Sequence, residues 1–166
     1  MADNLQNNDQ NSGNDGAISP KDAEPGFFDI LIIDDDKWIQ RVLINYLRNW
    51  KLSAMPMQDP IEGMVFAIEK KPKLILLDIK MPYINGDSVL RFLKNLKITA
   101  KIPVIIISGN LEKDLVRDLY QKGADGFLSK PVTIESLYEK LKSVLGAEAF
   151  AEFEEAEVKK EHEPKQ

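Results

Sequence analysis

Several apolar runs of the sequence stop at a polar residue that could bind a metal, attack an electrophile or neutralise an anion. Short apolar runs rich in β-branched residues are typical of strands that are buried on both faces of a sheet. In an open α/β sheet, ligands bind at the edge formed by the carboxyl ends of the strands. We therefore expect the residues that end these runs to lie close together. They are Asp34 and Asp35 after the first run, Asp78 after the third, Ser108 after the fourth and Lys130 after the fifth.

This set of residues predicts a site for a divalent metal and a phosphoryl group. Three carboxylates at one point repel one another and need a compensating cation to ionise together. Mg²⁺ fits, since it takes one or two carboxylates, keeps several waters and leaves room for phosphate oxygens. Lys130 and Ser108 would add an ammonium group and a hydroxyl beside it. A central carboxylate such as Asp78 can itself attack phosphorus and form an acyl phosphate.

The elements that must position these residues alternate along the chain. Apolar runs predict strands, and spacings of three and four between apolar residues predict helices. The second strand is the weakest, and Pro56 favours an edge position for it, because proline cannot donate to a ladder. The expected strands are 27–33, 52–57, 74–77, 102–107 and 124–128, and the expected helices are 37–50, 60–70, 86–96, 111–122 and 133–145.

Five strands alternating with five helices predict an α/β protein with a doubly wound parallel sheet. The strongest apolar runs should be central and the second strand should lie at an edge. This favours the flavodoxin-like strand order 2-1-3-4-5, in which the first and third strands are neighbours. Two details of the helices are also expected. Asp36 should cap the first helix, and the second should direct Ile61, Met64, Val65 and Ile68 inward.

Composition separates the chain into a body and two acidic ends. Residues 1–26 and 147–166 each carry a net charge of −4, whereas 27–146 carry +3, within a total of −5 for the 166 residues. The first segment is rich in Asn, Asp, Gln, Ser and Gly, so we expect it to be disordered. Segment 147–166 is rich in Ala, Glu and Lys, and we expect a frayed helix or disorder there. The body, 27–146, should form the one folded domain.

The same composition bears on location and on classes of partner. The sequence has no cysteine, so it offers no disulfide framework and no thiol-based metal site. No apolar run approaches the ~18 residues of a membrane span, and the first residues lack the features of a signal peptide. We therefore expect a cytoplasmic protein. The small positive charge of the body gives no argument for direct binding of nucleic acid.

Taken together, the motifs resemble the receiver domain of two-component response regulators, over roughly residues 28–145 and most closely in its single-domain, chemotaxis-regulator-like form. Each motif alone is modest, but four occur in order, each at the end of a predicted strand. The serine of the third lies 30 residues after Asp78, and the lysine of the fourth lies 52 residues after it. The segments that carry the resemblance are 32–36, 76–82 with the turn 85–86, 107–109 and 123–131.

The resemblance implies specific roles at the acidic site. Asp78 would accept a phosphoryl group from the phosphohistidine of a sensor histidine kinase or a histidine phosphotransfer protein. Asp34 and Asp35 would bind Mg²⁺ or Mn²⁺ together with Asp78 and the backbone carbonyl of Lys80. Lys130 would contact the phosphoryl oxygens, and the peptide bond that follows it is expected to be cis.

The resemblance also implies a switch. Ser108 would turn to the phosphoryl group and Phe127 would turn inward, altering the surface of the fourth helix, fifth strand and fifth helix. Phe127 stands where Tyr is frequent in the family. Lys80, Gly109 and Asn110 flank the acceptor and should tune the lifetime of the acyl phosphate. Partner binding is expected through the same surface, which could also support a homodimer, although the sequence does not decide whether one forms. The chain would be a stand-alone receiver or a fragment of a longer protein.

Two other functions compete with a receiver. A haloacid-dehalogenase-type phosphatase also uses an aspartate nucleophile and Mg²⁺, but it needs an acid two residues after the nucleophile, where this chain has Lys80. The other is a pseudo-receiver that only binds partners. Such domains usually lack part of the acidic pair, the acceptor or the lysine, all of which are present here. We therefore expect no enzymatic activity beyond phosphoryl acceptance and self-dephosphorylation.

Overall fold

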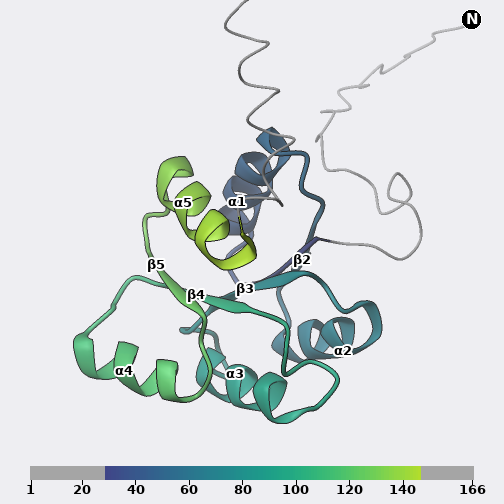
Figure 1. The fold of residues 1–166 in the computed structure, drawn as a ribbon, viewed down its shortest axis with the longest axis vertical. Coiled ribbons are helices and arrows are strands. Elements are labelled where there is room, and N and C mark those ends of the chain that lie inside the picture. Colours follow the sequence, from purple (N-terminus) through teal and green to yellow (C-terminus); the bar gives the residue numbers. More distant parts are fainter. Residues whose placement is uncertain (1–28, 147–166) are drawn as a thin grey trace, which may run out of the picture.

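The computed structural model describes residues 29–146, so the expectations for 1–26 and 147–166 lie outside the described residues. Within 29–146, strands and helices alternate as expected from the sequence. Figure 1 shows α1 and α5 on one face of a single sheet, and α2, α3 and α4 on the other. The elements are β1 Ile30–Ile33, α1 Lys37–Asn49, β2 Ala54–Met57, α2 Pro60–Lys70, β3 Leu74–Asp78, α3 Gly86–Asn95, β4 Val104–Ser108, α4 Lys113–Gln121, β5 Gly126–Ser129 and α5 Ile134–Leu145.

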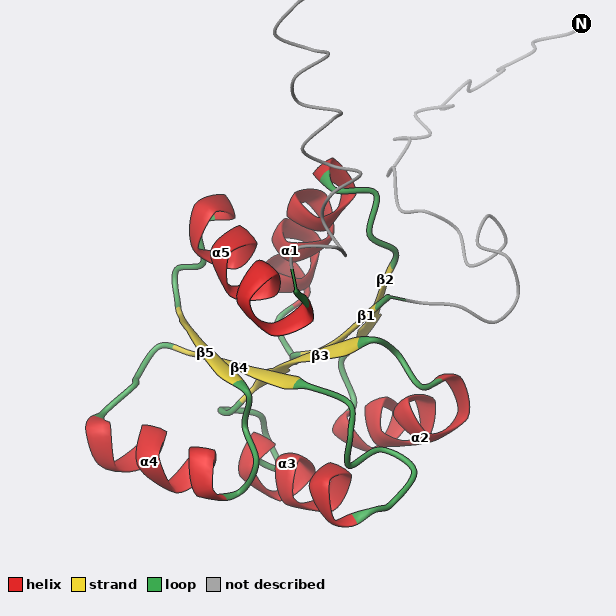
Figure 2. Cartoon of the chain, viewed as in Figure 1, coloured by secondary structure: helices red, strands yellow, loops and turns green. Residues whose placement is uncertain are grey.

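The sheet is parallel throughout and has the order β2-β1-β3-β4-β5, which confirms the predicted fold. Strands β1, β3 and β4 are buried along their whole length, whereas β2 is only half-buried at the edge. Pro56 lies in that edge strand opposite Ile32. Figure 2 shows the yellow strands as one twisted layer between two layers of red helices.

Alternation of side chains along each strand divides the core into two layers. Leu31 and Ile33 point to the layer under α2, α3 and α4. Ile30 and Ile32 point to the layer under α1 and α5. The strands are therefore apolar at every position because both faces are covered. This burial fixes the register of the strands, so the polar residues that end them are held at one edge.

Side-chain caps define the helix starts. Asp36 accepts hydrogen bonds from the backbone N–H groups of Trp38 and Ile39, which confirms the predicted cap of α1. Thr133 caps α5 in a reciprocal capping box with Ser136. Helix α4 differs, since its cap residue, Glu112, makes no capping hydrogen bond through its side chain. That helix begins at Lys113, two residues later than predicted.

The predicted inward face of α2 is wrong at two positions. Ile61 and Val65 are 53% and 48% exposed, whereas the helix buries Gly63, Phe66 and Ala67. The physical reason is a close approach of α2 to β1. A Cβ atom at Gly63 would lie 2.8 Å from Cδ1 of Ile33, so this close approach is possible only at a glycine. The face of α2 that contains Gly63 therefore packs against the sheet.

Strand ends also differ from the predicted bounds. Strand β4 extends to Ser108, whose neighbour across the ladder is Ser129. It begins two residues later than predicted, at Val104, whose N–H donates to the carboxylate of Asp125. Among residues 29–146, no helix is long and apolar enough to cross a membrane.

Candidate functional site

The pairing of the strands brings the predicted site residues to one edge of the sheet. Ile33 pairs with Leu77, so Asp34 and Asp78 follow side by side on β1 and β3. Ser108 ends the next strand, and its carbonyl accepts a hydrogen bond from the N–H of Lys130, 2.9 Å away. The residues predicted for the site follow four different strands and lie together at the carboxyl edge of the sheet.

Three carboxylates form the floor of this site. One oxygen each of Asp34, Asp35 and Asp78 lies within 4.8 Å of the others. Asp34 and Asp78 are 1% and 4% exposed, whereas Asp35 is exposed. Asp35 is therefore the one carboxylate of the three that is exposed to solvent.

Lys130 is the cation that the structure places against these acids. Its Nζ lies 2.9 Å from Oδ2 of Asp34 and 2.8 Å from Oδ1 of Asp78. Burial opposes the charge on this lysine, but the two ion pairs outweigh burial and raise the pKa of Lys130. The ammonium group is therefore held charged between the carboxylates of Asp78 and Asp34.

Burial dominates the electrostatics of Asp34. Desolvation raises the pKa of Asp34, although Lys130 and the N–H of Asp36 favour the ionised form. That N–H donates to Oδ1 at 2.9 Å. The ammonium group of Lys130 therefore does not fully offset the burial of the Asp34 carboxylate, and a further cation near this carboxylate would favour its ionised form.

The donor set fits a hard divalent ion such as Mg²⁺. All three side chains offer carboxylate oxygens, and Asp35 has solvent access through which a hydrated ion could enter. Two amides that the sequence prediction missed hold the backbone behind them. Gln40 donates to the carbonyl of Asp34 at 2.8 Å, and Gln58 donates to the carbonyl of Asp35 at 3.1 Å. Gln40 could have been found as a polar residue on the otherwise apolar face of α1.

The loop between β3 and α3 packs directly against the backbone of Asp78. A Cβ atom at Gly86 would lie 2.1 Å from the carbonyl oxygen of Asp78, so only glycine fits. The N–H of Gly86 donates to the carbonyl of Ile79 at 3.0 Å, and Asn85 caps α3. Lys80, within this loop, has an exposed side chain. Its backbone carbonyl as a metal ligand stays a prediction.

Ser108 is buried, and its hydroxyl pairs with the backbone of Asn110. The hydroxyl donates to the carbonyl of Asn110 at 2.9 Å and accepts from the N–H of Asn110 at 3.2 Å. This local pairing was not foreseen from the sequence. Gly109 and Asn110 are exposed, and a Cβ atom at Gly109 would meet nothing within 4 Å. The chain directly after Ser108 is therefore open to solvent.

Phe127 is half-buried on β5, away from the acids. Its ring packs edge-on against Tyr120 of α4, with 4.7 Å between the ring centroids. Among the residues of α4, only Leu119 is buried. The peptide bond between Lys130 and Pro131 is cis, as expected from the resemblance.

The strand order and the acidic carboxyl edge define a doubly wound α/β protein with a polar site at its topological switch point. The model of the response regulator receiver domain family matches residues 30–142, and the chain belongs to this family. Receiver domains serve phosphorylation-dependent signalling in two-component systems and are generally non-enzymatic modules.

Three proteins illustrate the similarity. The chain is 31% identical over 118 residues to the DNA-binding dual master transcriptional regulator RpaA of Synechocystis, covering 70% of this chain and 48% of that protein. It is 26% identical over 117 residues to the polar-differentiation response regulator DivK of Brucella anthropi, covering 70% and 95%. A structure of chemotaxis protein CheY4 of Vibrio cholerae matches with a TM-score of 0.68 and 21% identity, covering 72% and 100%, and supports the fold.

These relatives differ in length. The chain spans about half the length of the first curated relatives that it matches, including RpaA and the phosphate regulon regulator PhoB of Pseudomonas aeruginosa. It spans 95% of DivK. The shared part is therefore the receiver domain.

Proposed function

We propose that this chain is a Mg²⁺-dependent phosphoacceptor in which Asp78 takes a phosphoryl group from a phosphohistidine of a sensor histidine kinase or phosphotransfer protein. One observation carries the proposal. Asp78 lies buried at the end of β3, 2.8 Å from the Lys130 ammonium group and within 4.8 Å of the carboxylates of Asp34 and Asp35. A nucleophile, a phosphoryl-binding cation and a metal-binding pair then surround one point.

In the transfer step, a carboxylate oxygen of Asp78 attacks phosphorus. The P–N bond to the histidine breaks, its electron pair stays on the imidazole, and an acyl phosphate forms on Asp78. Lys130 is already beside this carboxylate, so its ammonium group would neutralise charge on the phosphoryl oxygens without a large movement. Its second partner, Asp34, would keep that ammonium group oriented.

Asp34 and Asp35 would hold the metal, together with Asp78 and the backbone carbonyl of Lys80. When bound, Mg²⁺ supplies positive charge that offsets the three carboxylates and the incoming phosphoryl group. Asp34 is fixed for this role by the hydrogen bonds to its side chain and to its carbonyl. Asp35 keeps its side chain in solvent while Gln58 holds its carbonyl.

Formation of the acyl phosphate would change the conformations of Ser108 and Phe127. To reach the phosphoryl group, the Ser108 hydroxyl must leave both groups of Asn110 that it now contacts. Movement at this point would displace the start of α4, which has no side-chain cap. Phe127 would then leave Tyr120 and turn inward, changing the surface of α4, β5 and α5 for a downstream protein or a second copy.

Two rival functions, a phosphatase and a pseudo-receiver, fit this site less well. A phosphatase of the haloacid dehalogenase type needs an acid at position 80, where this chain presents an exposed lysine. Turnover of p-nitrophenyl phosphate would support that rival. A pseudo-receiver usually lacks the acceptor or the lysine, whereas in this chain Asp78 is buried and forms an ion pair with the half-buried Lys130. Absence of any Mg²⁺ effect on the fluorescence of Trp38, which lies close to the acidic pair, would support it.

The first test is labelling by a small phosphodonor. We expect acetyl phosphate with Mg²⁺ to label the full chain and Asp78→Asn to abolish the label, because the variant lacks the attacking carboxylate. Asp59→Asn is the matched control, since Asp59 only caps α2 and asparagine caps equally well. Label that survives in Asp78→Asn, read by mass spectrometry of intact protein, would refute the proposal.

A further inference from the structure

Three large apolar side chains are exposed beside the acidic site. They are Trp38 at the start of α1, Ile61 at the start of α2 and Tyr83 in the loop before α3. Each follows a different strand, β1, β2 or β3, so all three lie at the carboxyl edge of the sheet. We call them the apolar rim. They are 68%, 53% and fully exposed, respectively.

Tyr83 has a strained backbone that nothing in the described chain explains. Its φ is +66°, and the N–H of Ile84 donates to the carbonyl of Pro82 at 2.7 Å, which makes a γ-turn of the rare, positive-φ kind. A bulky residue is disfavoured at positive φ, because its Cβ atom crowds the backbone. Glycine would avoid this crowding.

The ring of Tyr83 gives no intramolecular compensation for this strain. It is fully exposed, so within residues 29–146 no apolar contact offsets the backbone cost. Strain of this kind tends to occur at functional sites, where the side chain is presented to something else. Tyr and Trp are also the residues that most often dominate the energy of protein interfaces. The rim therefore has the composition of a docking surface.

The chemistry of the site indicates which partner would contact this rim. Asp78 is only 4% exposed and lies at the bottom of the site. A donor that carries its phosphoryl group on a protein side chain must bring its own surface down over the loops after β1, β2 and β3. A small donor such as acetyl phosphate reaches Asp78 without touching them.

We infer that Trp38, Ile61 and Tyr83 form the docking surface for a protein phosphodonor whose phosphohistidine is flanked by apolar side chains. The inference rests on the proposed function, because it needs Asp78 to be the acceptor. It separates two sides of the site. The donor contacts the β2-β1-β3 side, whereas the β4-β5 side carries Ser108 and Lys130.

The test compares two donors on the same variants of the full chain. The donors are acetyl phosphate and a histidine phosphotransfer protein, phosphorylated beforehand and selected from a panel for transfer to the wild type. Tyr83→Gly removes the ring and relieves the positive φ, so poor folding would not explain its effect. Trp38→Ala and Ile61→Ser truncate the other two rim positions.

We expect each rim variant to lower the ratio of the protein-donor rate to the acetyl phosphate rate about tenfold or more, since hot-spot residues of an interface carry most of its binding energy. Phe92→Ala and Ile98→Ala are matched controls, because they are 43% and 45% exposed and lie outside the rim. These controls should leave the ratio within about twofold.

The outcomes separate the inference from the proposed function. An unchanged ratio in all three rim variants would overturn the docking surface, as would an equal loss in the two controls. Labelling by acetyl phosphate without transfer from any protein of the panel would also overturn it, while leaving Asp78 as an acceptor. Failure of both donors to label the wild type would instead overturn the proposed function.

Discussion

Aspartates and lysines lie at both edges of the sheet, but they are paired differently at the two edges. At the amino edge, each carboxylate has partners of its own. Asp29, before β1, pairs with Lys73 at 2.7 Å and accepts from the N–H and hydroxyl of Ser53. Asp125, before β5, pairs with Lys94 at 2.8 Å and accepts from the N–H at the start of β4.

At the carboxyl edge, three carboxylates share one ammonium group. Lys130 contacts Asp34 and Asp78, while Asp35 reaches only solvent with its side chain. The carboxylates of Asp29 and Asp125 are thus each paired with a lysine, whereas the cluster of Asp34, Asp35, Asp78 and Lys130 holds two more negative than positive groups. A buried excess of one sign raises the free energy of the folded chain unless a cation or proton compensates it. The comparison indicates that the carboxyl edge is built to receive positive charge.

The largest expected difference between the edges concerns their lysines. Lys130→Met should lower the rate of labelling by acetyl phosphate by about 10²-fold, because it removes a cation that stabilises the transferred charge. Lys94→Met should leave that rate within about twofold. It should instead lower the free energy of unfolding by about 1–3 kcal/mol, because Asp125 and the carbonyl of Ile102 lose a charged partner.

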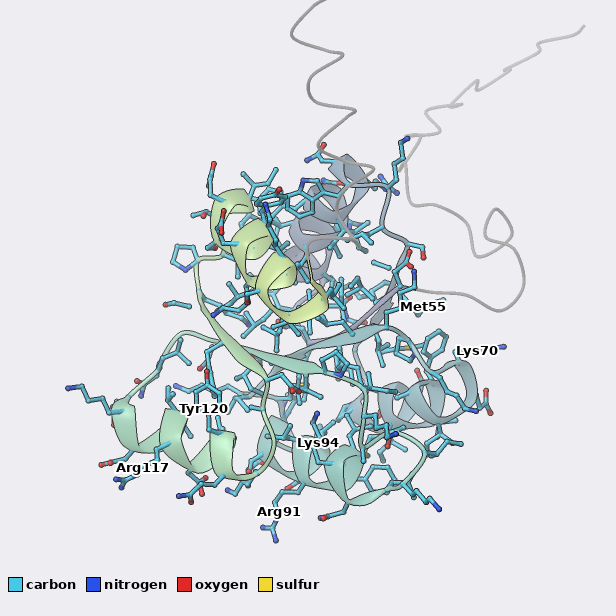
Figure 3. All side chains as sticks on the ribbon, in the orientation of Figure 1. Met55, Lys70, Arg91, Lys94, Arg117 and Tyr120 are labelled. Carbon is cyan, nitrogen blue, oxygen red and sulfur yellow. The ribbon has the colours of Figure 1, made fainter. Side chains whose placement is uncertain are left out.

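Rates from mass spectrometry and urea denaturation of both variants test this contrast. Lys94 and Arg91 come from the same helix, but Arg91 projects away from the molecule (Figure 3) and is exposed. Arg91→Met is therefore the control that should change neither quantity. An equal loss of labelling in the Lys94 and Lys130 variants would remove the distinction between the edges.

The fold, and which residues lie at the carboxyl edge of the sheet, could be predicted because both follow from strong hydrophobic patterns in the sequence. Continuous apolar strands fix the sheet order, and that order places Asp34 beside Asp78. The cap at Asp36 follows from its position before an amphipathic run. The same patterns cannot reveal close approaches of backbone. The close approach of Gly63 to Ile33 leaves Ile61 exposed, whereas Met64 of the same helix still packs against the core.

Side-chain partners within the site were harder to predict. The sequence indicates that Ser108 ends a strand, but not that its hydroxyl is occupied by Asn110. Nor does it indicate that Gln40 supports the carbonyl of Asp34. Such hydrogen bonds depend on rotamers and on turns of two or three residues, for which hydrophobic periodicity carries no information. The strain at Tyr83 is likewise visible only as a backbone angle.

Variants at the two edges should also differ in how much Mg²⁺ stabilises the fold, by a smaller effect. Adding Mg²⁺ at about 100 times its dissociation constant should stabilise the wild type by about 2.7 kcal/mol, if it binds only the folded state. Asp35→Asn should lose most of this gain, since it removes the most accessible of the three carboxylates. Asp125→Asn should keep all of it. Thermal unfolding with and without EDTA measures both, and equal gains in the two variants would contradict a metal site at the carboxyl edge.

The smallest effect concerns pH, where the two edges should respond with opposite sign. At Asp29, burial acts to raise the pKa, but hydrogen bonds from Lys73 and Ser53 outweigh it and lower the pKa below the unfolded 3.8. Its stabilisation is therefore present above about pH 4 and is lost as pH falls through the lower folded value. At Asp34, desolvation raises the pKa, so its ionised form costs stability at neutral pH and the cost falls as pH drops through the raised folded value.

Urea denaturation in EDTA between pH 3 and pH 7 tests this opposition with two variants. Asp29→Asn should be less stable than the wild type by about 1 kcal/mol at pH 7, and the difference should shrink in acid. Asp34→Asn should gain stability relative to the wild type at pH 7 and lose that advantage in acid, because the wild-type carboxyl is then also neutral. The two stability differences, for Asp29→Asn and for Asp34→Asn, should therefore change with pH in opposite directions. A change in the same direction would contradict the electrostatic difference between the two edges of the sheet.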